Sequence, residues 1–137
     1  MHPTILYVED DEDDVFFMRR TWTDVGVPNP LQVVNDASAA RRYLSGTGPY
    51  ANRVEYPIPG LILLDLKLPG LLGTDLLKWI REQPTIHSVR VIMLSSSNRP
   101  ADIQAANELG ANSYIVKPAH VAEWRGLVEH LQTSWLT

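Results

Sequence analysis

The residues most able to do chemistry stand at the ends of four short apolar runs. The runs and the residues that follow them are Ile5–Val8 with Glu9 and Asp10, Leu61–Leu64 with Asp65, 91–94 with Ser95, and 114–116 with Lys117. Uninterrupted runs of this length are typical of strands in a parallel sheet that helices cover on both faces. Ligands of such open sheets bind beyond the carboxyl ends of the strands. The pattern therefore predicts that three acids, a hydroxyl and a lysine meet at one sheet edge.

Three carboxylates at one edge call for a cation. Two unit charges about 4 Å apart repel by about 4 kcal/mol at an effective dielectric of about 20. Oxygen ligands completed by water suit Mg²⁺ best. A metal-bound carboxylate can then act as a nucleophile toward a phosphoryl group, because the cation offsets the charge of the incoming oxygens. Ser95 and Lys117 would each contact a phosphoryl oxygen, one through its hydroxyl and the other as a point charge.

The segments between the runs supply helices, so strands and helices alternate along the chain. We expect strands at residues 5–8, 31–35, 61–64, 91–94 and 113–116. Expected helices run from Asp13 or Asp14 as N-cap to Val25, from Asp36 to Leu44, after Gly73 as far as Pro84, from Pro100 to Leu109, and over 119–134. Residues 46–60, which hold three glycines and three prolines, predict a long loop.

This alternation predicts an α/β fold with a doubly wound, five-stranded parallel sheet. Right-handed crossovers with helices on both faces give the flavodoxin-like strand order 2-1-3-4-5. The switch point of that order lies between the first and third strands. Glu9, Asp10 and Asp65 would meet there.

Composition excludes several classes of function. The 137 residues are 45% hydrophobic and 20% charged, as in an ordinary globular protein of one domain. There is no cysteine for a disulfide or a thiolate metal site, and no apolar stretch nears the roughly 20 residues that span a bilayer. The net charge of −4 argues against nucleic acid as a partner. A cytoplasmic location is expected, with no membrane partner.

The motifs at these strand ends resemble those of response-regulator receiver domains. The matching segments are 8–10, 64–69 with Gly73, 95–97 and 110–118, and together they cover essentially the whole chain. A narrower resemblance is to the single-domain regulators that partner phytochrome-type histidine kinases. It rests on residues 9–11, the Gly48–Tyr50 loop, residues 110–114, and Trp135 with Leu136.

The resemblance implies a role for each residue around the expected metal. Asp65 resembles the phospho-acceptor, which takes its phosphoryl group from a histidine of a sensor kinase. Asp10 and Asp65 would bind Mg²⁺ directly, Glu9 would help through a water molecule, and the backbone carbonyl of Lys67 would complete the protein ligands. Glu9 stands where Asp is commoner, and Lys67 where Asn or Met is common.

The resemblance also implies a switch. Ser95, where Thr is more usual, would bond the phosphoryl group and move toward it, and Tyr114 would turn inward as Ser95 moves. Lys117 would pair with the phosphate, and the Lys117–Pro118 peptide bond is expected to be cis. Positions 67 and 97 tend to set how fast the phosphoryl bond hydrolyses in the family.

Two other classes of protein share this fold or chemistry. A flavodoxin-like cofactor protein would bind a phosphate after the first strand, where the acids at 9–12 would repel it. A phosphatase that forms an aspartyl-phosphate is the alternative function. Such enzymes carry a second Asp two residues after the nucleophile, where this chain has Lys67. We expect no enzymatic activity beyond Mg²⁺-dependent self-phosphorylation and autodephosphorylation.

The expected output is a contact with another protein. Only a few residues follow the last expected helix, so residues 1–137 are expected to form a single receiver domain without an output domain. In receivers the signalling surface is usually formed by the fourth helix, the fifth strand and the fifth helix. We expect a homodimer through this face, with Trp135 and Leu136 exposed beyond the end of the last helix.

Overall fold

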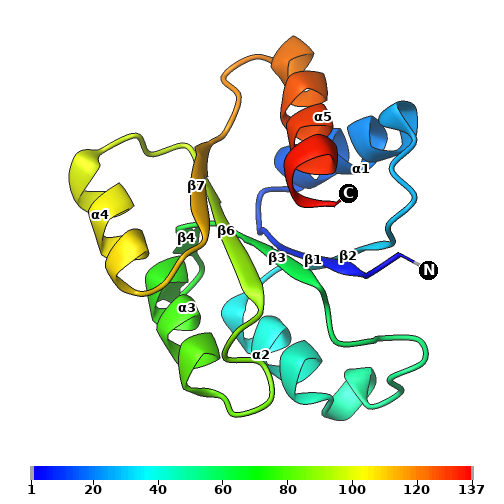
Figure 1. Cartoon of the computed structure of the whole chain (residues 1–137), viewed down its shortest axis with the longest axis vertical. Coiled ribbons are helices and arrows are strands. Elements are labelled where there is room, and N and C mark those ends of the chain that lie inside the picture. The colour runs from blue at the N-terminus through cyan, green and yellow to red at the C-terminus, as the bar shows by residue number, and fades with distance from the viewer. Residues whose placement is uncertain (1, 137) are drawn as a thin grey trace.

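The computed structural model describes residues 2–136 and has a five-stranded parallel sheet at its centre (Figure 1). The strands follow the order β2 (Leu31–Val34), β1 (Ile5–Val8), β3 (Leu61–Leu64), β6 (Arg90–Ser95) and β7 (Ser113–Val116). Every neighbouring pair in this sheet is parallel. Counted in chain order, this is the predicted order 2-1-3-4-5, which is confirmed.

Helices cover both faces of the sheet. Figure 1 shows α1 (Glu12–Val25) and α5 (Trp124–Trp135) on one face, and α2 (Ala37–Ser45), α3 (Gly73–Glu82) and α4 (Pro100–Glu108) on the other. Because side chains alternate along a strand, Leu6 and Val8 pack under α2 and α3, while Ile5 and Tyr7 pack under α1 and α5. The central strands β1 and β3 are buried throughout, which explains their unbroken apolar runs.

The start of α1 differs from the prediction. The N-cap is Asp11, whose carboxylate accepts the N–H groups of Asp13 and Asp14 at 2.9 and 3.1 Å. The predicted caps, Asp13 and Asp14, instead lie in the first turn, where acidic side chains suit the positive end of the helix dipole. In a run of six acids several residues could cap the helix, and the turn directly after β1 selects the earlier one.

A short hairpin that the sequence did not indicate follows the acceptor strand. It pairs β4 (Lys67–Leu68) with β5 (Leu71–Leu72) around a turn in which Gly70 has φ 72°. The hairpin returns the chain to β3, so that the Gly73 N–H donates to the Leu66 carbonyl at 2.6 Å. A Cβ on Gly73 would lie 2.0 Å from the Asp65 carbonyl oxygen, so the backbone beside Asp65 leaves room only for glycine.

The segment between α2 and β3 is built around one arginine and three tyrosines. It contains a 3₁₀ turn, η1 (Gly48–Tyr50), in addition to the predicted loop. The Arg53 guanidinium donates to the carbonyls of Tyr43 and Leu44, at the end of α2, over 2.7 and 2.8 Å. The Tyr43, Tyr50 and Tyr56 rings pack with centroids 5.1 to 5.9 Å apart. This segment is therefore an ordered cap on α2.

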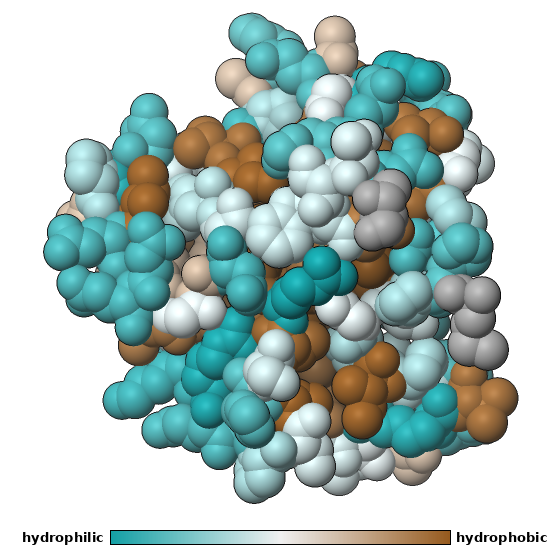
Figure 2. All heavy atoms as spheres, in the orientation of Figure 1, coloured by the Kyte–Doolittle hydropathy of each residue, from teal (hydrophilic) through white to brown (hydrophobic). Residues whose placement is uncertain are grey.

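Apolar side chains are scattered on the face of the molecule that Figure 2 draws. In Figure 2 the brown residues form separate spots on a mostly teal and white face, including the lower right corner where the segment from α2 to β3 runs. Val54 and Ile58 of that segment are among the exposed apolar side chains. None of the helices within residues 2–136 is long and apolar enough to cross a bilayer.

The end of the chain also departs from expectation. A 3₁₀ turn, η2 (Val121–Glu123), precedes α5, and the helix continues through Trp135. Trp135 and Leu136 are half-buried against the core between α1, α5 and the sheet, and the Arg90 guanidinium lies 5.7 Å from the centre of the Trp135 ring. The prediction that both residues are exposed beyond the helix is wrong, because their apolar surface still finds the core.

Candidate functional site

The predicted acids meet at the carboxyl ends of β1 and β3. Val8 and Leu64 are paired in the sheet register, so Glu9 and Asp65 leave adjacent strands at the same level. Glu9, Asp10 and Asp65 each offer a carboxylate oxygen, and these oxygens lie within 4.8 Å of one another. Glu9 and Asp65 are buried and Asp10 is exposed, so the cluster opens to solvent on one side.

Lys117 comes to this cluster from the end of β7. Its backbone N–H donates to the Ser95 carbonyl at 2.7 Å, which extends the pairing of β6 and β7 beyond the last strand residue. The ammonium nitrogen lies 2.5 Å from Glu9 Oε1, 2.8 Å from Asp14 Oδ2 and 3.4 Å from Asp65 Oδ2. The side chain is 9% exposed, so three carboxylates share one buried cation.

The carboxylates around Lys117 stabilise its protonated form. Burial acts to lower the pKa of Lys117, but the carboxylates of Asp14, Glu9 and Asp65 outweigh burial and raise that pKa above its usual value. Lys117 therefore stays protonated, as a partner for a phosphoryl oxygen must be.

Glu9 is the most buried acid of the site. Its Oε1 accepts the Tyr7 phenol at 3.2 Å in addition to Lys117, and its Oε2 accepts the Asp11 N–H at 3.2 Å. Burial raises the pKa of Glu9, Lys117 lowers it and the neighbouring Asp65 raises it, and together these effects bring that pKa to about 7. Burial, with the Glu9 carboxylate beside it, likewise raises the pKa of the Tyr7 phenol.

The donor set fits a divalent cation. Three carboxylates supply hard oxygen ligands, and the single buried ammonium leaves an excess of negative charge at this edge. Lys67 lies two residues after Asp65, at the start of β4, with its N–H 3.5 Å from Asp65 Oδ1. Its charged side chain is exposed. The role of the Lys67 carbonyl as a metal ligand stays a prediction.

The predicted switch residues are joined through Ser97. Ser95 is buried at the end of β6, and its hydroxyl oxygen accepts the Ser97 N–H at 3.1 Å. The Tyr114 phenol donates to the Ser97 carbonyl at 2.8 Å, and its half-buried ring packs against the core cluster that α2, α3 and α4 share with the sheet. Tyr114 therefore contacts the loop after Ser95 through its hydroxyl, and its inward turn on activation stays a prediction.

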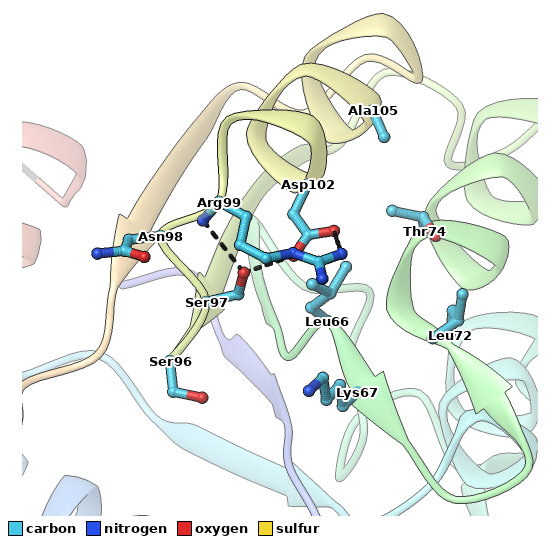
Figure 3. Close-up of a pocket in the computed structure, with 10 residues that line it drawn as sticks. All are labelled: Leu66, Lys67, Leu72, Thr74, Ser96, Ser97, Asn98, Arg99, Asp102 and Ala105. Atoms are coloured by element: carbon cyan, nitrogen blue, oxygen red, sulfur yellow. Dashed lines mark hydrogen bonds and ion pairs between the residues drawn. The ribbon is translucent and has the colours of Figure 1, made fainter.

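The loop after β6 is also fixed to α4, as Figure 3 shows. The Ser97 hydroxyl donates to the Asp102 carboxylate, which also accepts the Arg99 guanidinium through both oxygens at 3.2 Å. These hydrogen bonds from Ser97 and Arg99 hold the pKa of Asp102 below its usual value. A pocket of about 530 Å³ lies between this loop and the β4–β5 hairpin, with Lys67 at its edge.

Two findings at the site differ from the sequence analysis. Residues 2–136 contain no cis peptide bond, so the expected cis bond between Lys117 and Pro118 is not present. The trans form is the intrinsically preferred isomer of such bonds, and in it Lys117 reaches all three carboxylates.

Asp14 is a member of the site that the sequence analysis considered only as a helix cap. The available signal was its place in the run of six acids that follows the first strand.

Comparison with known proteins agrees with this arrangement. The family model described as "Response regulator receiver domain" matches residues 5–129. Response regulator Rcp1 of Synechocystis sp. is 31% identical over 132 residues, covering 96% of this chain and 88% of Rcp1. The solved structure of the Mn²⁺-bound form of Rcp1 has a TM-score of 0.87, 30% identity, and coverage of 98% of this chain and 94% of that one.

A further solved structure is that of the phosphorylated cyanobacterial phytochrome response regulator RcpA. It has a TM-score of 0.88 and 34% identity, and covers 100% of this chain and 98% of RcpA. With the sheet order, the acid cluster and the lysine already in place, these matches show that the chain belongs to the response-regulator receiver domain family.

Proposed function

We propose that this response regulator accepts a phosphoryl group on Asp65 from the histidine of a sensor kinase. The observation that carries the proposal is that Asp65 lies beside a buried cation and beside two further carboxylates. Lys117 lies on one side, 3.4 Å from Asp65 Oδ2, and the Glu9 and Asp10 carboxylates complete a metal-binding cluster with Asp65. A nucleophile, a fixed cation and a place for a second cation are the parts that phosphoryl transfer requires.

Transfer would form one bond and break one bond. A carboxylate oxygen of Asp65 bonds to phosphorus while the bond from phosphorus to the kinase imidazole breaks, and the imidazole keeps the electron pair. Lys117 would contact a phosphoryl oxygen, and the Ser95 hydroxyl would donate to another. Ser95 ends β6, the neighbour of β3, and Lys117 follows β7, the next strand on that side, so both approach the phosphoryl group from one side.

We propose Mg²⁺ as the ion held by Asp10 and Asp65, with Glu9 acting through water and the Lys67 carbonyl as a further ligand. The Mn²⁺-bound form of Rcp1 supports a divalent ion in this family, and an all-oxygen donor set suits Mg²⁺. When bound, the ion would neutralise charge on the phosphoryl oxygens. The proposal includes self-phosphorylation and autodephosphorylation with Mg²⁺ and no further enzymatic activity.

The signal would leave the site through the loop after β6. Movement of Ser95 toward the phosphoryl group would displace Ser97, which contacts both Tyr114 and Asp102 of α4. The surface of α4, β7 and α5 would therefore respond, and we propose that it forms a homodimer. Light scattering at high micromolar concentration tests this, with and without beryllofluoride as phosphoryl mimic. A monomer under both conditions contradicts the dimer.

The kinase partner is proposed to be of the bacteriophytochrome type. The support is the likeness to RcpA, which is described as a phytochrome response regulator. A cytoplasmic location follows from such a partner and stays a prediction. Phosphotransfer from a purified bacteriophytochrome kinase, compared with an unrelated histidine kinase, would test the pairing.

A phosphatase that uses an aspartyl-phosphate is the competing function. It needs an acid–base residue two positions after the nucleophile, and Lys67 there is an exposed cation. The proposed function is tested by incubating the protein with Mg²⁺ and a small phosphodonor and measuring its intact mass. We expect a phosphoryl adduct that is lost with a chelator and in Asp65→Asn. No adduct in the wild type, or one that persists in Asp65→Asn, contradicts the proposal.

A further inference from the structure

We propose that Asp14 is a positioning residue that holds Lys117 toward α1 in the unphosphorylated protein and opposes its transfer to the phosphoryl group. This inference rests on the proposed function of Asp65. Asp14 belongs neither to the acid cluster nor to the residues that the family resemblance assigned.

The contact itself is specific. Asp14 lies in the first turn of α1 and Lys117 after β7, so the pair joins segments 103 residues apart in sequence. The ammonium nitrogen is 2.8 Å from Asp14 Oδ2, a charge-assisted hydrogen bond of ordinary length. The side chains are 9% and 24% exposed, so solvent screens the pair less than it would a surface ion pair.

The distances rank the partners of Lys117. Glu9 and Asp14 lie within hydrogen-bond distance at 2.5 and 2.8 Å, whereas Asp65 Oδ2 lies at 3.4 Å, outside the usual range for such a bond. The ammonium therefore leans toward Glu9 and α1, away from the proposed acceptor. A phosphoryl oxygen on Asp65 must draw Lys117 away from Asp14 or share it.

The charge of Asp14 adds to this effect. The phosphoryl group carries about −1.5 to −2 charges, and Asp65 gives up its own carboxylate charge on forming the bond, so the site gains up to about one negative charge. The Asp14 carboxylate, one of three close to Lys117, partly cancels the cation that the phosphoryl group needs, and it repels the added charge. Both effects favour the unphosphorylated state, so removing the charge of Asp14 should favour the phosphorylated one.

Asp13 provides a matched control on the same turn. It is exposed, and like Asp14 its N–H is bonded to the Asp11 cap. Among the described residues its carboxylate forms none of the ion pairs. Asp13→Asn therefore removes the same charge from the same end of α1 without touching Lys117.

The experiment measures the affinity for beryllofluoride in saturating Mg²⁺ by calorimetry. We expect Asp14→Asn to bind about fivefold more tightly than the wild type, which corresponds to about 1 kcal/mol. Asp13→Asn should stay within about twofold of the wild type, a difference below 0.5 kcal/mol or so. Asp14→Glu, which keeps the charge, should bind more weakly than Asp14→Asn. In a Lys117→Gln background, Asp14→Asn should no longer change the affinity.

Each opposite result overturns the inference. Unchanged or weaker binding by Asp14→Asn would mean that Asp14 does not restrain Lys117. An equal gain in Asp13→Asn, or a gain that persists without Lys117, would mean that general electrostatics acts instead. If the wild type itself binds no beryllofluoride and forms no adduct at Asp65, the proposed function fails. If the wild type binds beryllofluoride and forms the adduct at Asp65, but Asp14→Asn has the same affinity as the wild type, only this inference fails.

Discussion

Replacing Glu9 by Gln should stabilise the metal-free protein in a way that depends on pH. Glu9 is fully buried, and in the absence of a metal its negative charge is held there by Lys117, the Tyr7 phenol and the Asp11 N–H. Burial nevertheless dominates and raises its pKa from the usual 4.5 to about 7. Gln has nearly the same shape and carries no charge, so the variant removes the cost of ionising this position.

The size and sign of the effect follow from linkage. A raised folded-state pKa means that the folded protein binds a proton more tightly than the unfolded chain does. Its contribution to stability is fully present below pH 4.5 and is lost as the pH rises to about 7. The loss amounts to about 3 kcal/mol, because one pKa unit corresponds to about 1.4 kcal/mol. The advantage of Glu9→Gln over the wild type should therefore grow by about this amount between pH 4.5 and pH 8 or so.

Urea unfolding between pH 5 and 8, with a chelator present, measures this difference. The buried indoles of Trp22 and Trp124 provide the fluorescence signal. Glu12→Gln, an exposed substitution in the first turn of α1, is the control and should change stability equally at every pH. Mg²⁺ should stabilise the wild type more than Glu9→Gln. Parallel stability curves for the wild type and Glu9→Gln across this range would refute the reasoning.

Three further substitutions test contacts that support the site or the fold around it. Gly73→Ala should destabilise the protein by about 1–3 kcal/mol, because its Cβ would meet the Asp65 carbonyl; Gly126→Ala in α5, where nothing lies within 4 Å, should not destabilise it. Urea unfolding measures both, and equal effects would contradict the steric argument. Arg53→Met should lower stability by about 1–3 kcal/mol through the lost bonds to the end of α2; a change under about 0.5 kcal/mol, as for an ordinary surface site, would contradict this. Asp102→Asn should speed amide hydrogen exchange over residues 97–103, since Ser97 and Arg99 lose their partner; unchanged exchange would contradict the proposed link to α4.

The sheet and the acid cluster could be predicted because local sequence determines them. Strands buried on both faces must be apolar along their whole length, as Leu61–Leu64 is, and parallel strands place their following residues at one edge. Asp36 and Gly46 marked the ends of α2 for equally local reasons. Asp36 accepts the Ala39 N–H, and Gly46 takes the left-handed conformation with φ 67°.

Features that depend on distant segments could not be predicted in this way. The Asp14–Lys117 pair needs α1 and the end of β7 to meet, which no spacing along the chain encodes. Within the run of acids, the choice of Asp11 as cap depended on where β1 ends. In the sequence, Arg53 looks like an ordinary surface charge in a loop rich in glycine and proline. In the structure, it donates to a carbonyl at the end of α2. Trp135 stays helical because the core and Arg90 cover its ring.

The location of the phosphoryl group is the most direct test of the central claim. Borohydride reduces an aspartyl-phosphate to homoserine, so reduction after phosphorylation leaves a permanent mark that peptide mass spectrometry can assign to one residue. Asp10, Asp14 and Asp65 all lie in this charged region, and of these three only Asp65 both belongs to the acid cluster and lies 3.4 Å from the Lys117 ammonium. We predict homoserine at position 65 alone, dependent on Mg²⁺. Homoserine at position 10 or 14, or none at position 65 in a protein that carries the phosphoryl mass, would contradict the account.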